Sequence, residues 1–210
     1  MRHPALFALT LIGVWGLSTL SGIADDADRC VNATGREGIA ACDRVIASGE
    51  TGTHGRAVAY SYRGRARLKI GEYDRAIADF DASIRLDPAN AWTFNNRGSA
   101  WYFRGDPDRA IADFDEAIQR DPAYALAYHN RGEVRKDKGD FNGAIADYGT
   151  AIRLDPDYTA AYTDRALAYQ RIGDRARAGQ DFRAALSQPA KYSDGEQAQT
   201  TFQVLPPPHQ

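Results

Sequence analysis

The sequence predicts an all-α solenoid built from stacked two-helix units, and two observations lead to that prediction. The first is a constant step of 34 residues, which separates four arginines and four glycines: Arg63, Arg97, Arg131 and Arg165, and Gly71, Gly105, Gly139 and Gly173. The second is an Asp-Pro pair that closes the first three units, at residues 87–88, 121–122 and 155–156. A period of this length is typical of small supersecondary units that stack side by side.

The first half of each unit is predicted to be a helix that ends at a glycine. In the first unit, Tyr60, Gly64 and Arg67 follow the step of four and then three residues that places side chains on one helix face. Gly71 comes next, and glycine adopts the left-handed conformation of a helix C-terminus at the lowest cost. The recurring glycine therefore marks the end of the first helix in all four units.

The second half of each unit is predicted to be another helix. Glu72 opens it in the first unit, where a carboxylate interacts favourably with the helix dipole, and aspartate takes this place in the other three units. Ala76, Phe80 and Ser83 form its buried stripe. The Asp-Pro pair ends the helix, because the residue before proline avoids helical geometry. The fourth unit closes at Pro189 instead.

This pattern resembles the tetratricopeptide repeat family. The family motif has an aromatic residue, a glycine and a second aromatic residue on the first helix, then Ala, an aromatic residue, Ala and Pro on the second. The second unit supplies the motif residues Phe94, Gly98, Trp101, Ala110, Phe114, Ala117 and Pro122. Three positions depart from this motif. Arg67 in the first unit and Arg135 in the third replace the second aromatic residue, and Ala166 replaces the glycine in the fourth unit. The resemblance covers Ala57 to Ala190 and implies an α-solenoid with a concave binding face.

The period divides the chain into seven segments. We expect a signal peptide at 1–24, a degenerate N-terminal half-repeat at 25–56, four tetratricopeptide repeats at 57–90, 91–124, 125–158 and 159–192, and a closing helix with a disordered proline-rich tail at 193–210. The closing helix is expected because Ala198, Phe202 and Leu205 follow a helical step, and because repeat arrays usually need a cap.

The first 24 residues have the layout of a secretory signal peptide. Arg2 gives a positive start, residues 5–20 are apolar, and Gly22 and Ala24 are the small residues of a cleavage site before Asp25. The apolar run is shorter than the roughly 20 residues that span a bilayer. An uncleaved membrane anchor is the alternative. We therefore expect an exported protein, periplasmic or secreted, that meets the membrane only through an uncleaved signal segment.

The half-repeat carries both cysteines of the chain, Cys30 and Cys42. Residues 38–46 resemble the second helix of a unit, so the helix before them would start inside the signal peptide and leave a stub at 26–31 after cleavage. An even pair of cysteines in an exported protein is usually a disulfide, which would contribute roughly 3 kcal/mol here. Two free buried thiols are the alternative. A helix at about 37–48 and eight helices in the repeats make nine main helices after the signal peptide.

Composition and motifs argue against an enzyme, a metalloprotein and a nucleic-acid binder. The chain has 26 Lys and Arg against 28 Asp and Glu, which gives no excess of basic charge for nucleic acid. The sequence has no nucleophile elbow, no phosphate-binding glycine loop and no two histidines one helical turn apart. His54 and His129 lack zinc-ligand spacing to either cysteine. We therefore expect no catalytic residue, no cofactor and no metal.

A row of charges recurs with the period. The four arginines of the period lie on the first helices, and four aspartates with the same step lie on the second helices: Asp79, Asp113, Asp147 and Asp181. We interpret the row as ion pairs between neighbouring helices. A periodic row of ligand-binding arginines is the alternative.

Each first helix has a second stripe that the motif residues do not use. In the second unit this stripe holds Trp92, Asn95, Ser99 and Tyr102, with Phe103 beside it. In the tetratricopeptide family the equivalent stripes line the concave groove where peptides bind. The resemblance therefore implies a partner-binding set of Trp92, Asn95, Ser99, Tyr102, Phe103, His129, Lys136, Arg65 and Lys69. Packing of the aromatic residues between units is the alternative.

The sequence thus predicts a scaffold or adaptor that binds a protein or peptide segment along its concave face. The carboxylate clamp that some members of the family use is poorly matched, because Ser61 and Leu126 stand where basic residues would be expected. A binder of glycans or other non-peptide ligands in the cell envelope is the alternative, since Trp92 and Tyr102 could stack on sugar rings. A structural subunit of a larger envelope complex is a third interpretation.

Overall fold

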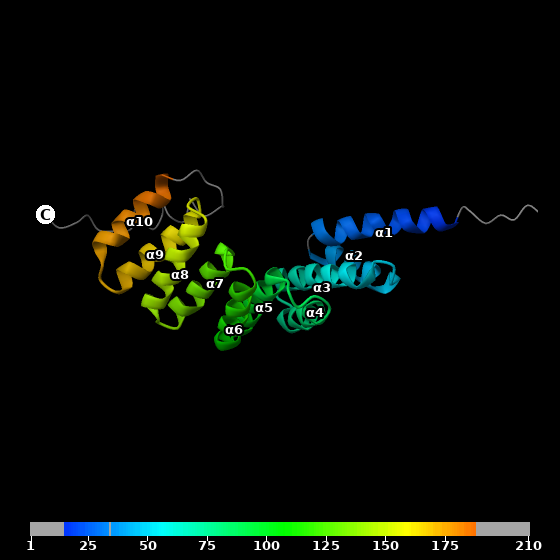
Figure 1. Ribbon diagram of the computed structural model, residues 1–210, viewed down its shortest axis with the longest axis horizontal. Helices are drawn as coiled ribbons and strands as arrows, with labels where there is room; N and C mark the ends of the chain where they lie inside the picture. The colour runs from blue at the N-terminus through cyan, green and yellow to red at the C-terminus, as the bar shows by residue number, and fades with distance from the viewer. Residues whose placement is uncertain (1–14, 34, 188–210) are drawn as a thin grey trace, which may run out of the picture.

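The computed structural model describes residues 15–33 and 35–187, and every regular element in these ranges is a helix (Figure 1). The helices are α1 Trp15–Asn32, α2 Gly35–Ser48, α3 Gly52–Lys69, α4 Tyr73–Leu86, α5 Ala91–Arg104, α6 Pro107–Arg120, α7 Ala125–Asp137, α8 Phe141–Leu154, α9 Thr159–Arg171 and α10 Arg175–Ser187. The predicted all-α solenoid is confirmed, because each helix packs against the next along the chain. The start of the expected signal peptide and the expected closing segment at 193–210 lie outside the described residues.

The array has a distinct inner face. The first helices of successive units contact one another, α3 with α5, α5 with α7 and α7 with α9. Within the described ranges, the second helices α4, α6, α8 and α10 make no such contacts among themselves. A curved stack brings its helices closer together on the inner side, so α3, α5, α7 and α9 line what we call the inner face. This is the face on which the sequence placed the partner-binding stripe.

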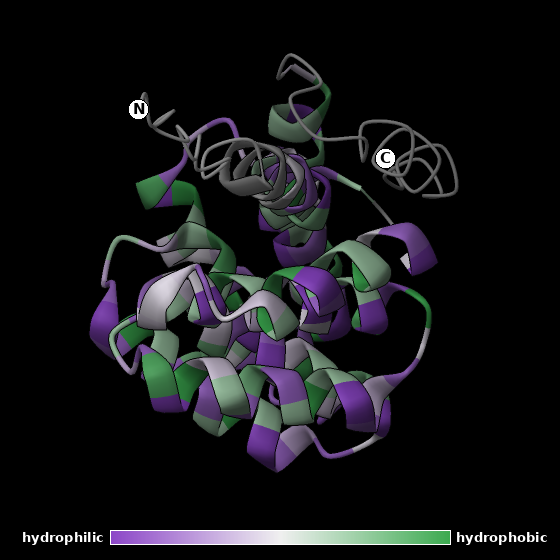
Figure 2. Cartoon of the chain, turned by 90° about the vertical axis from the view of Figure 1, so that its right-hand side faces the viewer, coloured by the Kyte–Doolittle hydropathy of each residue, from purple (hydrophilic) through white to green (hydrophobic). Residues whose placement is uncertain are grey.

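The cores of the array are shared between neighbouring units. Buried residues form separate clusters, such as Phe80 with Ala100 of the next unit, and Phe114 with Val134 of the next. In the view down the array, hydrophobic and hydrophilic residues mix along each helix (Figure 2). Each unit therefore buries its apolar stripe against its neighbours, as expected for a repeat protein.

The glycine of each first helix makes room for an aromatic ring. A Cβ atom on Gly98 would lie 2.8 Å from the ring of Phe114, which is fully buried, and the corresponding glycines of the first and third units lie against their rings in the same way. Contacts this short do not occur between real side chains, so glycine lets the two helices of a unit approach closely. In the fourth unit the buried Ala166 takes this place.

The predicted helix ends are present in the structure. The four periodic glycines have the positive φ angles of a left-handed cap: Gly71 81°, Gly105 95°, Gly139 83° and Gly173 84°. Asp106 and Asp140 each accept a hydrogen bond from a backbone N–H in the first turn of α6 and α8, at 3.1 and 2.9 Å. Glu72 makes no such side-chain cap on α4. The shorter aspartate side chain therefore does more at this position than the dipole argument alone predicted.

The arginine row consists of ion pairs, as interpreted from the sequence. Arg97 donates from Nε and Nη2 to both carboxylate oxygens of Asp113 in its own unit, at 2.8 and 2.6 Å. Its Nη1 donates to Asp81 of the preceding unit at 2.6 Å. Each arginine thus ties the two helices of its unit together, and in the first three units it also reaches the helix before them. Arg165 pairs with Asp181, but Gly149 stands where a preceding carboxylate would be needed.

The two arginines that depart from the family motif strengthen this row. Arg67 and Arg135 each donate to the aspartate that the row arginine of their unit already binds, both at 2.8 Å. In the second unit the same place is taken by Trp101, and the guanidinium of Arg109 lies 4.6 Å from the centre of its ring. Arg67 and Arg135 therefore form an ion pair at the position where Trp101 makes an aromatic contact.

The N-terminal unit contains the helix that the sequence comparison placed before residues 38–46. α1 is one 18-residue helix that begins at Trp15, inside the expected signal peptide, and passes through the expected cleavage site at Ala24. The stub at 26–31 is expected only after cleavage and stays a prediction. α1 packs on α2 and α3. None of the helices in the described ranges is long and apolar enough to cross a membrane.

Candidate functional site

The first part of the candidate site is an aromatic contact between α3 and α5. The ring of Trp92 lies 5.2 Å from the ring of Tyr62, measured between centroids. The guanidinium of Arg65 lies 4.6 Å from the centre of the Tyr62 ring and 5.7 Å from that of Trp92. Arg65 also donates to the carbonyl oxygen of Val31 at 2.9 Å. Trp92 therefore packs between neighbouring units, which is the role that the sequence left open as the alternative, and Arg65 also joins neighbouring units.

The second part lies near the C-terminal end of α5. The Tyr102 hydroxyl donates to the carboxylate of Asp137 in the next unit, and burial together with this hydrogen bond raises the pKa of Tyr102. Phe103 beside it is 59% exposed and stacks on Tyr73, with ring centroids 6.1 Å apart. Phe103 is thus the aromatic residue of the predicted stripe that presents most of its ring to solvent.

The polar residues of the predicted stripe are largely engaged with the protein itself. Asn95 is buried and accepts a hydrogen bond from the Asn130 amide of α7 at 2.9 Å. The Ser99 hydroxyl donates to the backbone carbonyl oxygen of Asn95 at 3.1 Å. Lys69 is exposed at the end of α3. Asn95 therefore joins two units, and Ser99 bonds within its own helix. These side-chain groups are already engaged in hydrogen bonds within the protein.

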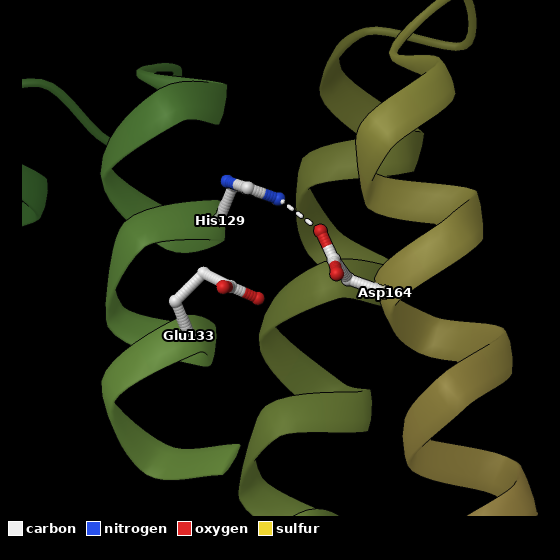
Figure 3. Close-up of side chains that lie close together, drawn as sticks. All are labelled: His129, Glu133 and Asp164. Carbon is white, nitrogen blue, oxygen red and sulfur yellow. Dashed lines mark hydrogen bonds and ion pairs between the residues drawn. The ribbon is translucent and has the colours of Figure 1, made fainter. Parts of the chain in front are cut away.

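A third part is a polar cluster between α7 and α9, which we call the His129 cluster: His129, Glu133, Lys136 and Asp164. His129 Nε2 lies 2.9 Å from a carboxylate oxygen of Asp164, and Glu133 points toward the same position (Figure 3). The Lys136 ammonium lies 2.6 Å from a carboxylate oxygen of Glu133 and 3.4 Å from one of Asp164. Two first helices thus direct a histidine, two carboxylates and a lysine toward one point.

The surroundings of the His129 cluster are crowded and negative. The His129 side chain is 12% exposed, its ring contacts Tyr148 and Tyr158, and its buried Nδ1 has no hydrogen-bond partner within the part of the chain that the structure describes. Burial lowers the pKa of Lys136, but nearby carboxylates outweigh burial and raise it overall. Burial and the same carboxylates also raise the pKa of Tyr148, whose hydroxyl donates to Glu133. The cluster therefore favours positive charge.

A hollow of about 600 Å³ lies beside this cluster, where α7, α8 and α9 meet. Phe141 and Leu167 give it an apolar part, while Lys136, Asp137 and Arg171 bring charges to it. The guanidinium of Arg171 lies 4.9 Å from the centre of the Phe141 ring. The hollow can therefore receive a group that combines apolar and charged or polar parts.

Sequence reasoning placed His129 and Lys136 in the partner-binding set but missed Asp164. The missing signal is a spacing of 35 residues between contacting side chains on the inner face. This spacing joins Asn95 to Asn130, Tyr102 to Asp137, and His129 to Asp164. It is one residue longer than the period, so the period alone points to Thr163 instead of Asp164.

The fold and the inner face define a helical-repeat solenoid with a lined concave side. A tetratricopeptide repeat family model matches residues 62–125, and a TPR repeat model matches residues 132–173. The chain belongs to the tetratricopeptide repeat family, as its motif residues indicated. No curated protein matches the sequence.

Solved structures show the same fold. A crystal structure of MamA protein superposes with a TM-score of 0.66 at 23% identity, over 92% of this chain and 100% of the other. YrrB, described as a TPR protein with an unusual peptide-binding site, gives 0.61 at 16% identity, over 88% and 89%. The second TPR domain of human RPAP3, in complex with an HSP70 peptide, gives 0.53 at 32% identity, over 56% of this chain and 98% of the domain.

Proposed function

We propose that the protein is an interaction scaffold that binds an extended protein or peptide segment along the C-terminal ends of α5, α7 and α9. The observation that carries the proposal is the hydrogen bond from Tyr102 to Asp137, because it joins two surface features. Asp137 lines the hollow, and Tyr102 contacts the exposed ring of Phe103. An exposed aromatic side chain, a hydrogen-bonded bridge and a partly apolar hollow therefore form one continuous surface.

The proposal moves the expected contact residues along the inner face. Trp92 and Asn95 are engaged in contacts between units, so we assign them to holding the shape of the face. Phe103 and Arg171 are exposed, and each lies at one end of the proposed surface. Aromatic and arginine side chains often carry much of the energy of a protein interface. Solved relatives in complex with peptides support the same kind of use, and proteins of this fold are generally non-enzymatic scaffolds.

The double change Phe103→Ala with Arg171→Ala tests the surface. We expect partner capture from a cell-envelope fraction to weaken at least about tenfold, because truncating an interface aromatic can cost about 2 kcal/mol or more. The melting temperature should change little, since both side chains are exposed. Leu154→Ala, an exposed apolar residue on the second helix α8, is the matched control.

Three outcomes would contradict this proposal. Capture that is unaffected by the double change excludes the surface. Capture of glycan rather than protein by the wild type, lost in the same variant, favours the envelope glycan binder. A large loss of melting temperature with capture intact shows that Phe103 and Arg171 are packing residues.

We also propose that the protein is exported, is cleaved after Ala24 and carries a disulfide between Cys30 and Cys42. Two contacts with α2 would remain after cleavage there, because both involve residues on the C-terminal side of Ala24. Arg44 pairs with Asp26 through two hydrogen bonds of 2.6 and 2.9 Å. Cys30 and Cys42 lie at disulfide distance, with Cα atoms 4.6 Å apart. A shortened α1 would therefore keep these ties to α2.

Mass spectrometry of the native protein tests both parts. Its N-terminal peptide should begin at Asp25, and non-reducing peptide mapping should link Cys30 to Cys42. Recovery of intact Met1 from membranes would favour the anchor instead. Complete thiol labelling of denatured, unreduced protein would exclude the disulfide.

A further inference from the structure

The geometry of the inner face points to a second property, which does not depend on the proposed function. We propose that His129, Glu133 and Asp164 form a binding site for a divalent transition metal such as Zn²⁺, and that the Lys136 ammonium competes with the metal for the two carboxylates. One ligand atom from each of the three residues lies within 4.8 Å of the other two. The sequence alone led us to expect no metal.

The placement of the donors is that of a metal site. His129 and Glu133 are four residues apart on α7, so both project from the same helix face. Asp164 approaches them from α9, and all three point to one place (Figure 3). A tetrahedral zinc ion with bonds of about 2.1 Å holds its ligand atoms about 3.4 Å apart. Small side-chain rotations are therefore enough to close the three donors around an ion.

The type of donors selects the metal. One imidazole nitrogen and two carboxylate oxygens suit Zn²⁺ and neighbouring transition metals. Ca²⁺ takes six to eight oxygen ligands, and Mg²⁺ needs near-octahedral oxygen geometry. Three protein ligands of mixed type leave at least one position for water or another ligand.

The charge balance favours an added cation. Glu133 and Asp164 are both carboxylates, and Lys136 is the cation that contacts them. One ammonium thus faces two carboxylates, and a divalent ion would balance both of their charges. Lys136 is 21% exposed at its side chain, so the ammonium can turn to solvent when the metal binds.

Lys136→Met is the decisive variant, because it removes the competitor and keeps all three ligands. Calorimetric titration of untagged protein with zinc chloride should show one ion bound per chain. We expect Lys136→Met to bind at least about tenfold more tightly than the wild type. His129→Gln and Asp164→Asn should each bind at least about tenfold more weakly. His54→Gln is the matched control, since His54 is exposed on α3 and outside the cluster.

The overturning results are equally specific. Lys136→Met that binds no zinc, or binds it no more tightly than the wild type, excludes the competition. Zinc binding that is unchanged in His129→Gln and Asp164→Asn places the ion elsewhere in the chain. Circular dichroism in the presence of a chelator checks that each variant is folded before titration. Loss of zinc binding with partner capture intact would leave the proposed scaffold function untouched.

Discussion

The arginine row and the His129 cluster both join neighbouring units through charged side chains, yet they differ in how often they occur. Every unit repeats the pair that Arg97 makes with Asp113. The positions equivalent to His129 hold Ser61, Asn95 and Thr163, so no other unit can build the cluster. A contact that every unit needs is explained by the fold, whereas a contact found once needs a separate reason. Charged pairs that recur in every unit therefore serve the fold, and a charged cluster that occurs once is a candidate for a specific function.

The largest effect should come from breaking the arginine row. Arg97→Met leaves the Asp113 carboxylate, with a side chain only 7% exposed, without its bidentate partner. Removing one partner of a buried pair costs about 3 to 5 kcal/mol. We expect a loss of that size in the free energy of unfolding, measured by urea denaturation.

Two companion variants sharpen this measurement. Arg97→Met combined with Asp113→Leu should recover part of the loss, because no charge is left buried without a partner. Arg75→Ala removes the exposed pair with Glu72 and should change stability by less than about 1 kcal/mol. Equal losses for Arg97→Met and Arg75→Ala would show that the row is not structural.

A smaller effect is expected from the recurring glycine. In Gly98→Ala the new Cβ atom meets the Phe114 ring, and overpacking typically costs about 1 to 3 kcal/mol. The better helix propensity of alanine offsets about 1 kcal/mol of this. We expect a net loss of about 1 to 2 kcal/mol by the same urea measurement. A gain in stability would contradict this expectation. It would mean that the two helices of the unit move apart without cost to admit the methyl group, as the fourth unit admits Ala166.

The smallest effect should come from the cluster that occurs once. Asp164→Asn removes one of the two carboxylates beside Lys136, which keeps its contact with Glu133. Because these side chains are partly exposed, we expect less than about 1 kcal/mol of lost stability in chelator-treated protein. A loss as large as that of Arg97→Met would assign the cluster to the fold and remove the contrast between the two networks.

The same contrast explains what could be predicted from the sequence. The helices of the repeats, their glycine ends and the arginine pairs follow from patterns that occur up to four times, so chance is excluded by repetition. Asp164 was missed because its contact with His129 depends on how α7 and α9 lie against each other, which the period does not state. The roles of Trp92 and Asn95 in joining units also depend on that arrangement. α1 begins at Trp15, inside the expected signal peptide, where the comparison with the repeat units had placed the start of this helix.

Gly149 has a consequence for how the array opens. Arg165 lacks the tie to the preceding unit that Arg97 has, because Gly149 occupies the place of the aspartate that Asp115 provides one unit earlier. The fourth unit is therefore attached to the third through apolar contacts and the His129 cluster, without the arginine tie that the first three units have. Local unfolding starts where attachment is weakest, so opening of the array should begin with α9 and α10. Amide hydrogens there should exchange with solvent sooner than those of α5 and α6.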